Sequence, residues 1–302
     1  MNGITDTILM IRPKSFGPNA ETLKDNAFQS SSKAGEEASI AKTALVEFDT
    51  MVEELRRHDI EVMVIEDKVE PNTPDAIFPN NWFSTHGSSI VTYPMMAASR
   101  RAERREDVIN KLVKERGYKK RYGFEYHEDE DLFLEGTGSM VLDRDKKIAY
   151  ACLSQRTSIK VLEKFTVLYD YKKVVFNAVD DKGSAIYHTN VLMTVGTDYV
   201  IVCLDTIKSA EERAEVVDAI KSSGKELIDI SLDQMNSFAG NMLQVKSKLG
   251  EKFLVLSKAA YDSLDTTQID NLTKYNKLIT PQIPTIEKYG GGSVRCMIAE
   301  VF

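Results

Sequence analysis

Five short polar segments recur along this chain at a nearly constant interval. Asn81, Glu135, Asn190, Asn241 and Cys296 stand 54, 55, 51 and 55 residues apart, and each lies at the start of an apolar run. A regular interval of this kind indicates an array of similar supersecondary units. The sequence therefore predicts five units within its 302 residues.

Short β-type runs alternate with amphipathic helical stretches inside these units. Residues 90–92 precede a helical pattern over 101–116, and residues 199–204 precede one over 210–223. The alternation predicts an α/β fold. If the five units close around an axis, their polar segments meet in one central cavity. The alternative is that the glycines and asparagines of these segments only mark turns, as they commonly do.

Composition excludes several classes of partner. The net charge of −7 is spread along the chain without a basic stripe, which argues against nucleic acid. No apolar run is long enough to cross a membrane, and the first residues lack the pattern of a secretory signal. The hydrophobic content of 42% allows a substantial core. We therefore expect a soluble, cytoplasmic protein that binds neither nucleic acid nor membrane.

The last of the three cysteines is the candidate nucleophile. Cys152, Cys203 and Cys296 are odd in number and widely spaced, which favours neither a disulfide framework nor a zinc site. Cys296 follows the glycine run 290–292, and glycines let a ligand approach the backbone closely. The alternative is a buried structural cysteine after an ordinary loop.

Histidine and carboxylate partners for this cysteine come from other units. Of the four histidines, only His188 stands at the start of a predicted strand, over residues 186–193. A nearby imidazole can take the thiol proton, and a carboxylate such as Glu135 can orient the imidazole. No residues show metal-ligand spacing, and the acidic run 128–131 is expected to be a solvated loop. The expected site uses neither a metal nor a nucleotide.

Several segments, taken in order and spacing, resemble the arginine deiminase and amidinotransferase superfamily, the penteins. The similarity is greatest to its dimethylarginine-hydrolase-like and citrulline-hydrolase-like branch. It implies a fivefold pseudosymmetric α/β propeller of ββαβ units, with residues 1–302 forming one catalytic domain. It also implies a small amino-acid substrate and no cofactor, with a homodimer left open as the assembly. The segments that carry the resemblance are 74–81, 99–104, 134–136, 153–157, 188–190 and 290–296.

The resemblance also implies a role for each site residue. Cys296 matches the nucleophile, His188 the general acid and base, and Glu135 a carboxylate that holds the histidine or a substrate nitrogen. Arg100 and Arg156 match residues that grip the substrate α-carboxylate, a task suited to the planar guanidinium. Asp75 is expected to hold the amino-acid end or the distal nitrogen.

Amides stand where guanidine-processing members of the superfamily carry acids. These positions are Asn80, Asn81 and Asn190. A buried guanidinium without opposing carboxylates is costly, whereas a neutral ureido group is well served by amides. We therefore expect a citrulline hydrolase that releases ornithine, ammonia and carbon dioxide. The alternatives are an arginine deiminase, a methylarginine hydrolase or an amidinotransferase, and, from another class, a non-catalytic propeller that binds an amino acid or a protein.

Overall fold

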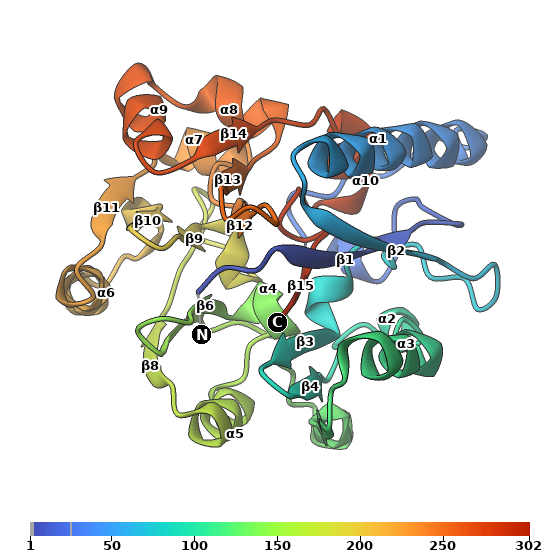
Figure 1. The fold of residues 1–302 in the computed structure, drawn as a ribbon, viewed down its shortest axis with the longest axis horizontal. Helices are drawn as coiled ribbons and strands as arrows, with labels where there is room; N and C mark the ends of the chain where they lie inside the picture. Colours follow the sequence, from blue (N-terminus) through green and yellow to red (C-terminus); the bar gives the residue numbers. More distant parts are fainter. Residues whose placement is uncertain (1–2, 25) are drawn as a thin grey trace.

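The fold contains five three-stranded sheets, each built in the same way. The computed structural model describes residues 3–24 and 26–302. In every sheet the middle strand pairs antiparallel with one neighbour and parallel with the other. The sheets surround the middle of the molecule, and helices lie outside them (Figure 1). Their strands, each set listed in spatial order, are β15 (Ala299–Val301), β1 (Thr7–Arg12) and β2 (Glu61–Glu66); β3 (Phe83–His86), β4 (Ser89–Thr92) and β5 (Lys120–Gly123); β6 (Val141–Asp143), β7 (Ile148–Cys152) and β8 (Lys172–Phe176); β9 (Met193–Val195), β10 (Tyr199–Val202) and β11 (Glu226–Asp229); and β12 (Leu243–Lys246), β13 (Lys252–Val255) and β14 (Lys277–Ile279).

Helices connect the two parallel strands of each sheet, as a parallel crossover requires. The crossover helices are α1 (Glu37–Arg57), α2 (Ala98–Arg101) with α3 (Glu106–Arg116), α5 (Ile159–Tyr169), α6 (Ala210–Ser222), and α8 (Lys258–Ser263) with α9 (Thr266–Thr273). The predicted ββαβ order therefore holds in each unit. The first unit is completed from the far end of the chain, because β15 pairs with β1 through Leu9 and Ala299.

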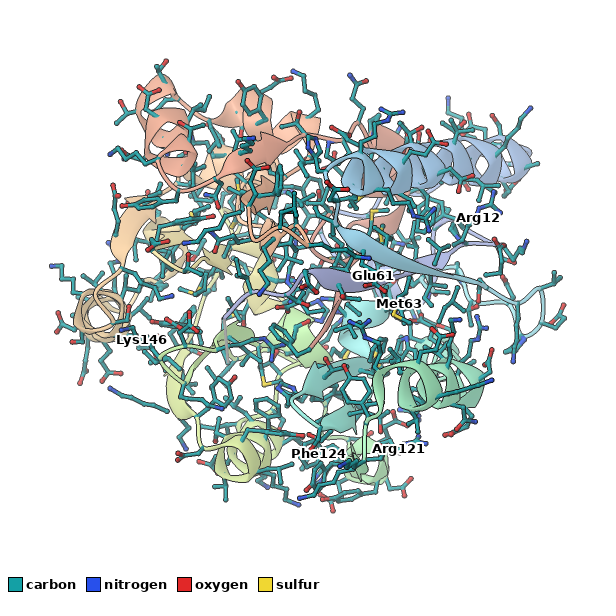
Figure 2. All side chains as sticks on the ribbon, in the orientation of Figure 1. Arg12, Glu61, Met63, Arg121, Phe124 and Lys146 are labelled. Atoms are coloured by element: carbon teal, nitrogen blue, oxygen red, sulfur yellow. The ribbon has the colours of Figure 1, made fainter. Side chains whose placement is uncertain are left out.

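Apolar faces of the helices and sheets form the core beneath each crossover. Phe48, Met51 and Leu55 of α1 pack with Ile8 and other buried side chains of the first sheet. Burying one such side chain contributes roughly 1.5–3 kcal/mol. Charged side chains of both signs project from the helices around the rim (Figure 2). Among the described residues, no helix combines the length and apolar character needed to span a membrane.

The five polar segments come shortly before the inner strands, as the repeat predicts, with the short helix α4 (Gly136–Ser139) between Glu135 and its strand. They lie before β3, β6, β9, β12 and β15. Neighbouring segments approach so closely that a side chain would not fit between them. A Cβ on Gly136 would lie 2.3 Å from the Asn80 carbonyl oxygen, and one on Gly240 would lie 2.2 Å from that of Val191. Residues far apart in the sequence therefore meet at the centre.

Two details of the prediction are wrong. The helical pattern over 101–116 is interrupted after Arg101, and α3 begins only at Glu106, because the backbone at Arg105 is extended. His188 does not begin a strand either: it caps the 3-10 turn η4 (Thr189–Val191), and β9 starts at Met193. The turn places His188 at the centre of the molecule, five residues before β9 begins.

Candidate active site

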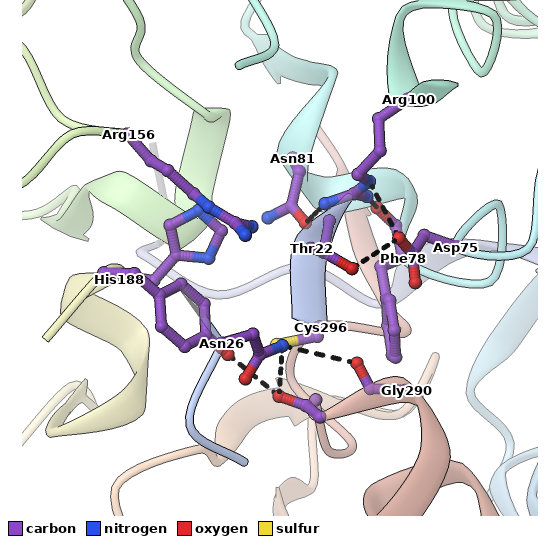
Figure 3. A pocket seen from close by; sticks show the side chains of 13 residues that line it. Thr22, Asn26, Asp75, Phe78, Asn81, Arg100, Arg156, His188, Gly290 and Cys296 are labelled. Atoms are coloured by element: carbon purple, nitrogen blue, oxygen red, sulfur yellow. Dashed lines mark hydrogen bonds and ion pairs between the residues drawn. The ribbon is translucent and has the colours of Figure 1, made fainter. Parts of the chain in front are cut away.

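A narrow cavity opens where the polar segments meet. Thr22 and Asn26 line it from the loop between β1 and α1, Arg100 from helix α2 and Arg156 from the loop between β7 and α5. The other lining residues come from the central segments. Its volume of about 20 Å³ holds little more than one water. Figure 3 shows the lining side chains directed into this space. The lining residues are Thr22, Asn26, Asp75, Phe78, Asn81, Arg100, Arg156, Tyr187, His188, Gly290, Gly291, Gly292 and Cys296.

The glycine run brings the Cys296 sulfur to this cavity. Helix α10 (Pro284–Gly290) ends at Gly291, whose φ of +65° favours glycine. A Cβ on Gly292 would lie 3.0 Å from the Phe78 ring and 3.2 Å from the Cys296 Cβ, so only glycine fits there without displacing its neighbours. Cys296 follows in a turn before β15 and is 6% exposed. The sulfur is thereby presented to the cavity while its surroundings stay close-packed.

Two amide side chains contact the sulfur. The Nδ2 atom of Asn190 lies 3.5 Å from Cys296 Sγ, and that of Asn241 lies 3.3 Å away. Asn190 and Asn241 are both buried. The Oδ1 atom of Asn190 has no hydrogen-bond partner among the described residues. The polar groups that touch the sulfur are therefore neutral amides.

His188, which lines the cavity, forms a buried pair with Glu135. His188 Nε2 lies 2.9 Å from Glu135 Oε2, and the other carboxylate oxygen accepts the backbone N–H of Met96. Burial alone would raise the pKa of Glu135, but the charge of Arg156 and the hydrogen bond to His188 hold it below its ordinary value. The ionised carboxylate can only accept, so Nε2 carries a proton and Nδ1 is left to exchange protons.

Burial favours the neutral form of this imidazole. Burial lowers the pKa of His188 below 6.5, because it outweighs the opposing hydrogen bond and charge of Glu135. A neutral His188 can act as a base at neutral pH. Figure 3 shows the ring and the Cys296 sulfur facing the same space.

Arg100 is buried and largely occupied by protein groups. Its Nε and Nη2 atoms donate to the two oxygens of Glu103, and Nη2 also reaches the Phe78 carbonyl. Its Nη1 atom donates to Asn81 Oδ1 at 2.9 Å. Because a guanidinium only donates, this bond fixes the Asn81 amide with Oδ1 toward Arg100. The Asn81 Nδ2 atom then points toward Arg156 and has no partner among the described residues (Figure 3).

Asp75 and Arg156 complete the charged side of the cavity. Asp75 accepts hydrogen bonds from Asn19 and Thr22 and lies 3.8 Å from Arg100 Nε. Burial raises the pKa of Asp75 against the opposing charge of Arg100. Arg156 lies 3.5 Å from Glu135 Oε2, and its guanidinium lies 4.9 Å from the centre of the Tyr187 ring.

One family model matches residues 12–302, and its description is N,N dimethylarginine dimethylhydrolase, eukaryotic. The chain belongs to this family. The family lies in the pentein superfamily, which confirms the resemblance inferred from the sequence motifs. A search of curated proteins gives no match.

Solved structures with the same fold include relatives of low sequence identity. The N-terminal domain of ArgZ, described as an arginine dihydrolase from cyanobacteria, is 16% identical, with a TM-score of 0.75 over 98% of this chain and 97% of that domain. AgrE with ornithine and NAD+ is 17% identical, with a TM-score of 0.76 over 98% of this chain but 39% of that one. A dimethylarginine dimethylaminohydrolase with an S-methyl-L-thiocitrulline adduct is 14% identical, with a TM-score of 0.64 over 98% and 99% of the two chains.

The structure brings most of the predicted site residues of this family member together. Cys296, His188, Arg100, Arg156, Asp75 and Asn81 line the cavity, while Glu135 and Asn190 touch its lining residues. Asn80 is buried beside Asn81 but does not line the cavity, and neither polar atom of its side chain has a partner among the described residues. No cluster of potential metal ligands occurs in residues 3–24 and 26–302.

The sequence reasoning missed the contribution of the loop between β1 and α1. Asn19, Thr22 and Asn26 reach Asp75 and the glycine run from this loop. Tyr187 was also missed, although its hydroxyl donates to the Gly291 carbonyl. One sequence signal could have pointed to this loop. The segment before α1 is rich in turn-forming residues and lacks the hydrophobic periodicity of a helix or strand.

Proposed function

We propose that this protein is a cysteine-dependent hydrolase that cleaves the ureido group of citrulline. The observation that carries this proposal is the fixed orientation of Asn81. Its Nδ2 donor faces the cavity because Arg100 holds Oδ1. A ureido oxygen can accept from that donor, whereas a guanidinium has only donors of its own. The Asn190 amide beside the sulfur adds a neutral polar group that suits a neutral substrate end.

The proposed reaction uses the three central residues in turn. His188 takes the proton of the Cys296 thiol, the thiolate attacks the ureido carbon, and His188 gives that proton to the departing ammonia as the C–N bond breaks. His188 then takes a proton from water, which attacks the thiocarbamate and releases the thiolate. The product carbamate loses carbon dioxide and leaves ornithine. Glu135 keeps the imidazole oriented throughout.

The charged side of the cavity is suited to the amino-acid end of the substrate. We assign the α-ammonium to Asp75. We assign the α-carboxylate to Arg156 together with the second N–H of Arg100 Nη1, which has no hydrogen bond to the described residues. We keep Asn80 as a proposed substrate-binding residue, although it lies next to Asn81 and outside the lining of the cavity. We further propose that residues 1–302 form one catalytic domain whose five units close into a propeller. The pairing of β15 with β1 supports this closure.

Arginine is the second candidate substrate, and the charge count favours it. Among the described residues, the carboxylates of Asp75, Glu103 and Glu135 lie near the guanidinium groups of Arg100 and Arg156, which leaves one negative charge over when all three carboxylates are ionised. A guanidinium substrate would match it. The similar ArgZ structure is described as an arginine dihydrolase, an activity that would pass through a ureido stage before ornithine.

Product identification tests the proposal. Purified protein is incubated with citrulline, arginine and asymmetric dimethylarginine, and the products are identified by mass spectrometry. The proposal expects ornithine and carbon dioxide from citrulline. Citrulline accumulating from arginine or from dimethylarginine, with no ornithine formed from added citrulline, would replace it with guanidinium hydrolysis.

A further inference from the structure

Asn241 lies beside the proposed nucleophile but has no place in the mechanism derived above. It comes from the segment before β12, in a different unit from both His188 and Cys296. Its side chain is 2% exposed, and its Nδ2 atom lies 3.3 Å from the Cys296 sulfur. Of the polar contacts that the structure gives this sulfur, it is the shortest.

Two hydrogen bonds to the backbone fix the orientation of this amide. Its Oδ1 atom accepts the backbone N–H of Arg295 at 3.1 Å, and its Nδ2 atom donates to the backbone carbonyl of Asn190 at 2.8 Å. Reversing the amide would place an oxygen against the Asn190 carbonyl and an NH₂ group against the Arg295 N–H. The second hydrogen of Nδ2 is therefore held toward the sulfur.

A fixed N–H donor has different effects on the two states of the sulfur. A thiolate accepts this hydrogen bond and is stabilised by it, and the low dielectric of a buried site strengthens the effect. The Oδ1 atom lies farther from the sulfur, at 3.7 Å, where it can accept only from the protonated thiol. The backbone bond to Arg295 also ties the amide to the residue next to Cys296.

We propose that Asn241 is a positioning residue that holds Cys296 as a reactive thiolate and fixes the sulfur in line with the substrate. The inference rests on the proposed role of Cys296 as the nucleophile. It adds a structural link from the fourth polar segment to the third and the fifth, since Asn241 bonds to both Asn190 and Arg295. The fourth segment thereby serves the chemistry without contacting the cavity itself.

Alkylation of Cys296 as a function of pH tests the inference without any substrate. Iodoacetamide is applied to wild type, Asn241→Ala and Asn241→Asp, and modification of the Cys296 peptide is followed by mass spectrometry. We expect the half-maximal rate to move upward by about one pH unit in Asn241→Ala, and further in Asn241→Asp, where a carboxylate opposes the thiolate. In steady state, kcat should fall while KM stays near its wild-type value.

Gln244→Ala is the matched control. Gln244 is a buried amide three residues along, bonded to Asn276 and to the backbone of Thr197 rather than to the sulfur. The Gln244→Ala variant should lower the melting temperature, as Asn241→Ala does. It should leave the pH dependence of Cys296 alkylation unchanged. If Asn241→Ala does not fold, Asn241→Ser keeps a small donor, and a shift of its profile in the same direction would still support the inference.

An unchanged alkylation profile in folded Asn241→Ala and Asn241→Asp would overturn the inference. So would an equal shift in Gln244→Ala. Because alkylation needs no substrate, either result is independent of whether citrulline is turned over. Conversely, failure of the citrulline assay with a shifted alkylation profile would count against the proposed substrate alone.

Discussion

Two regions of the site hold different kinds of polar group. Beside the Cys296 sulfur stand the neutral amides of Asn190 and Asn241. On the other side, carboxylates and guanidinium groups are buried in mutual contact, as in the pair of Arg100 with Glu103. Buried charges are tolerated only when paired, so the charged side is constrained by its own pairing. In the proposed reaction, this difference means that the charged groups orient the site, while neutral amides surround the nucleophile.

The largest effect is expected where the amide side holds the nucleophile. Cys296→Ala should reduce turnover by about 10⁴-fold or more, because no other group can form the covalent bond. Cys203→Ala is the matched control, since Cys203 is a free cysteine in the core of another unit. It should retain activity. Comparable activity in Cys296→Ala and Cys203→Ala, with both proteins folded, would end the nucleophile assignment.

On the charged side, Glu135→Gln should lower kcat by about 10²- to 10³-fold, because it loosens the general acid and base. It should also move the acid limb of the rate profile to lower pH. Activity needs neutral His188, whose pKa Glu135 raises, so removing that charge lowers the pKa further. Glu130→Gln is the control, because it removes a carboxylate contact to His127, which does not line the cavity. The acid limb of its rate profile should stay at the wild-type pH. An acid limb that moves upward in Glu135→Gln would contradict the proposed pairing.

A smaller effect is expected where the two sides touch. A Cβ on Gly138 would lie 2.4 Å from Asn81 Nδ2 and 2.8 Å from His188 Nδ1. Gly138→Ala should displace both side chains and lower kcat by about 10- to 100-fold, since small misplacements of catalytic groups are costly. Gly17→Ala meets no atom within 4 Å and should be neutral. Steady-state kinetics of both variants, with melting temperatures, would separate misplacement from unfolding.

The repeat made the architecture predictable, because each unit must place its polar segment at the same point of the same ββαβ pattern. The interval of these segments identified the inner strands, and their residue types identified the cavity. The orientation of Asn81 could not be predicted, since it depends on Arg100 being drawn into a buried pair with Glu103. The loop that carries Asn19 and Thr22 was missed for a similar reason. Its place is set by contacts with Asp75, which lies more than fifty residues away in the sequence.

The central claim is that the reacting side of the cavity is built for a neutral group, and one ratio tests it most directly. This is kcat/KM for citrulline over that for arginine, measured in wild type, Asn81→Asp and the control Asn26→Asp, which adds the same charge elsewhere on the cavity wall. Wild type should favour citrulline, and Asn81→Asp should reduce the ratio by about 10²-fold, because a new carboxylate opposes the ureido oxygen and suits a guanidinium. Asn26→Asp should change the ratio far less. A wild-type preference for arginine, or a ratio unaltered by Asn81→Asp, would contradict the claim.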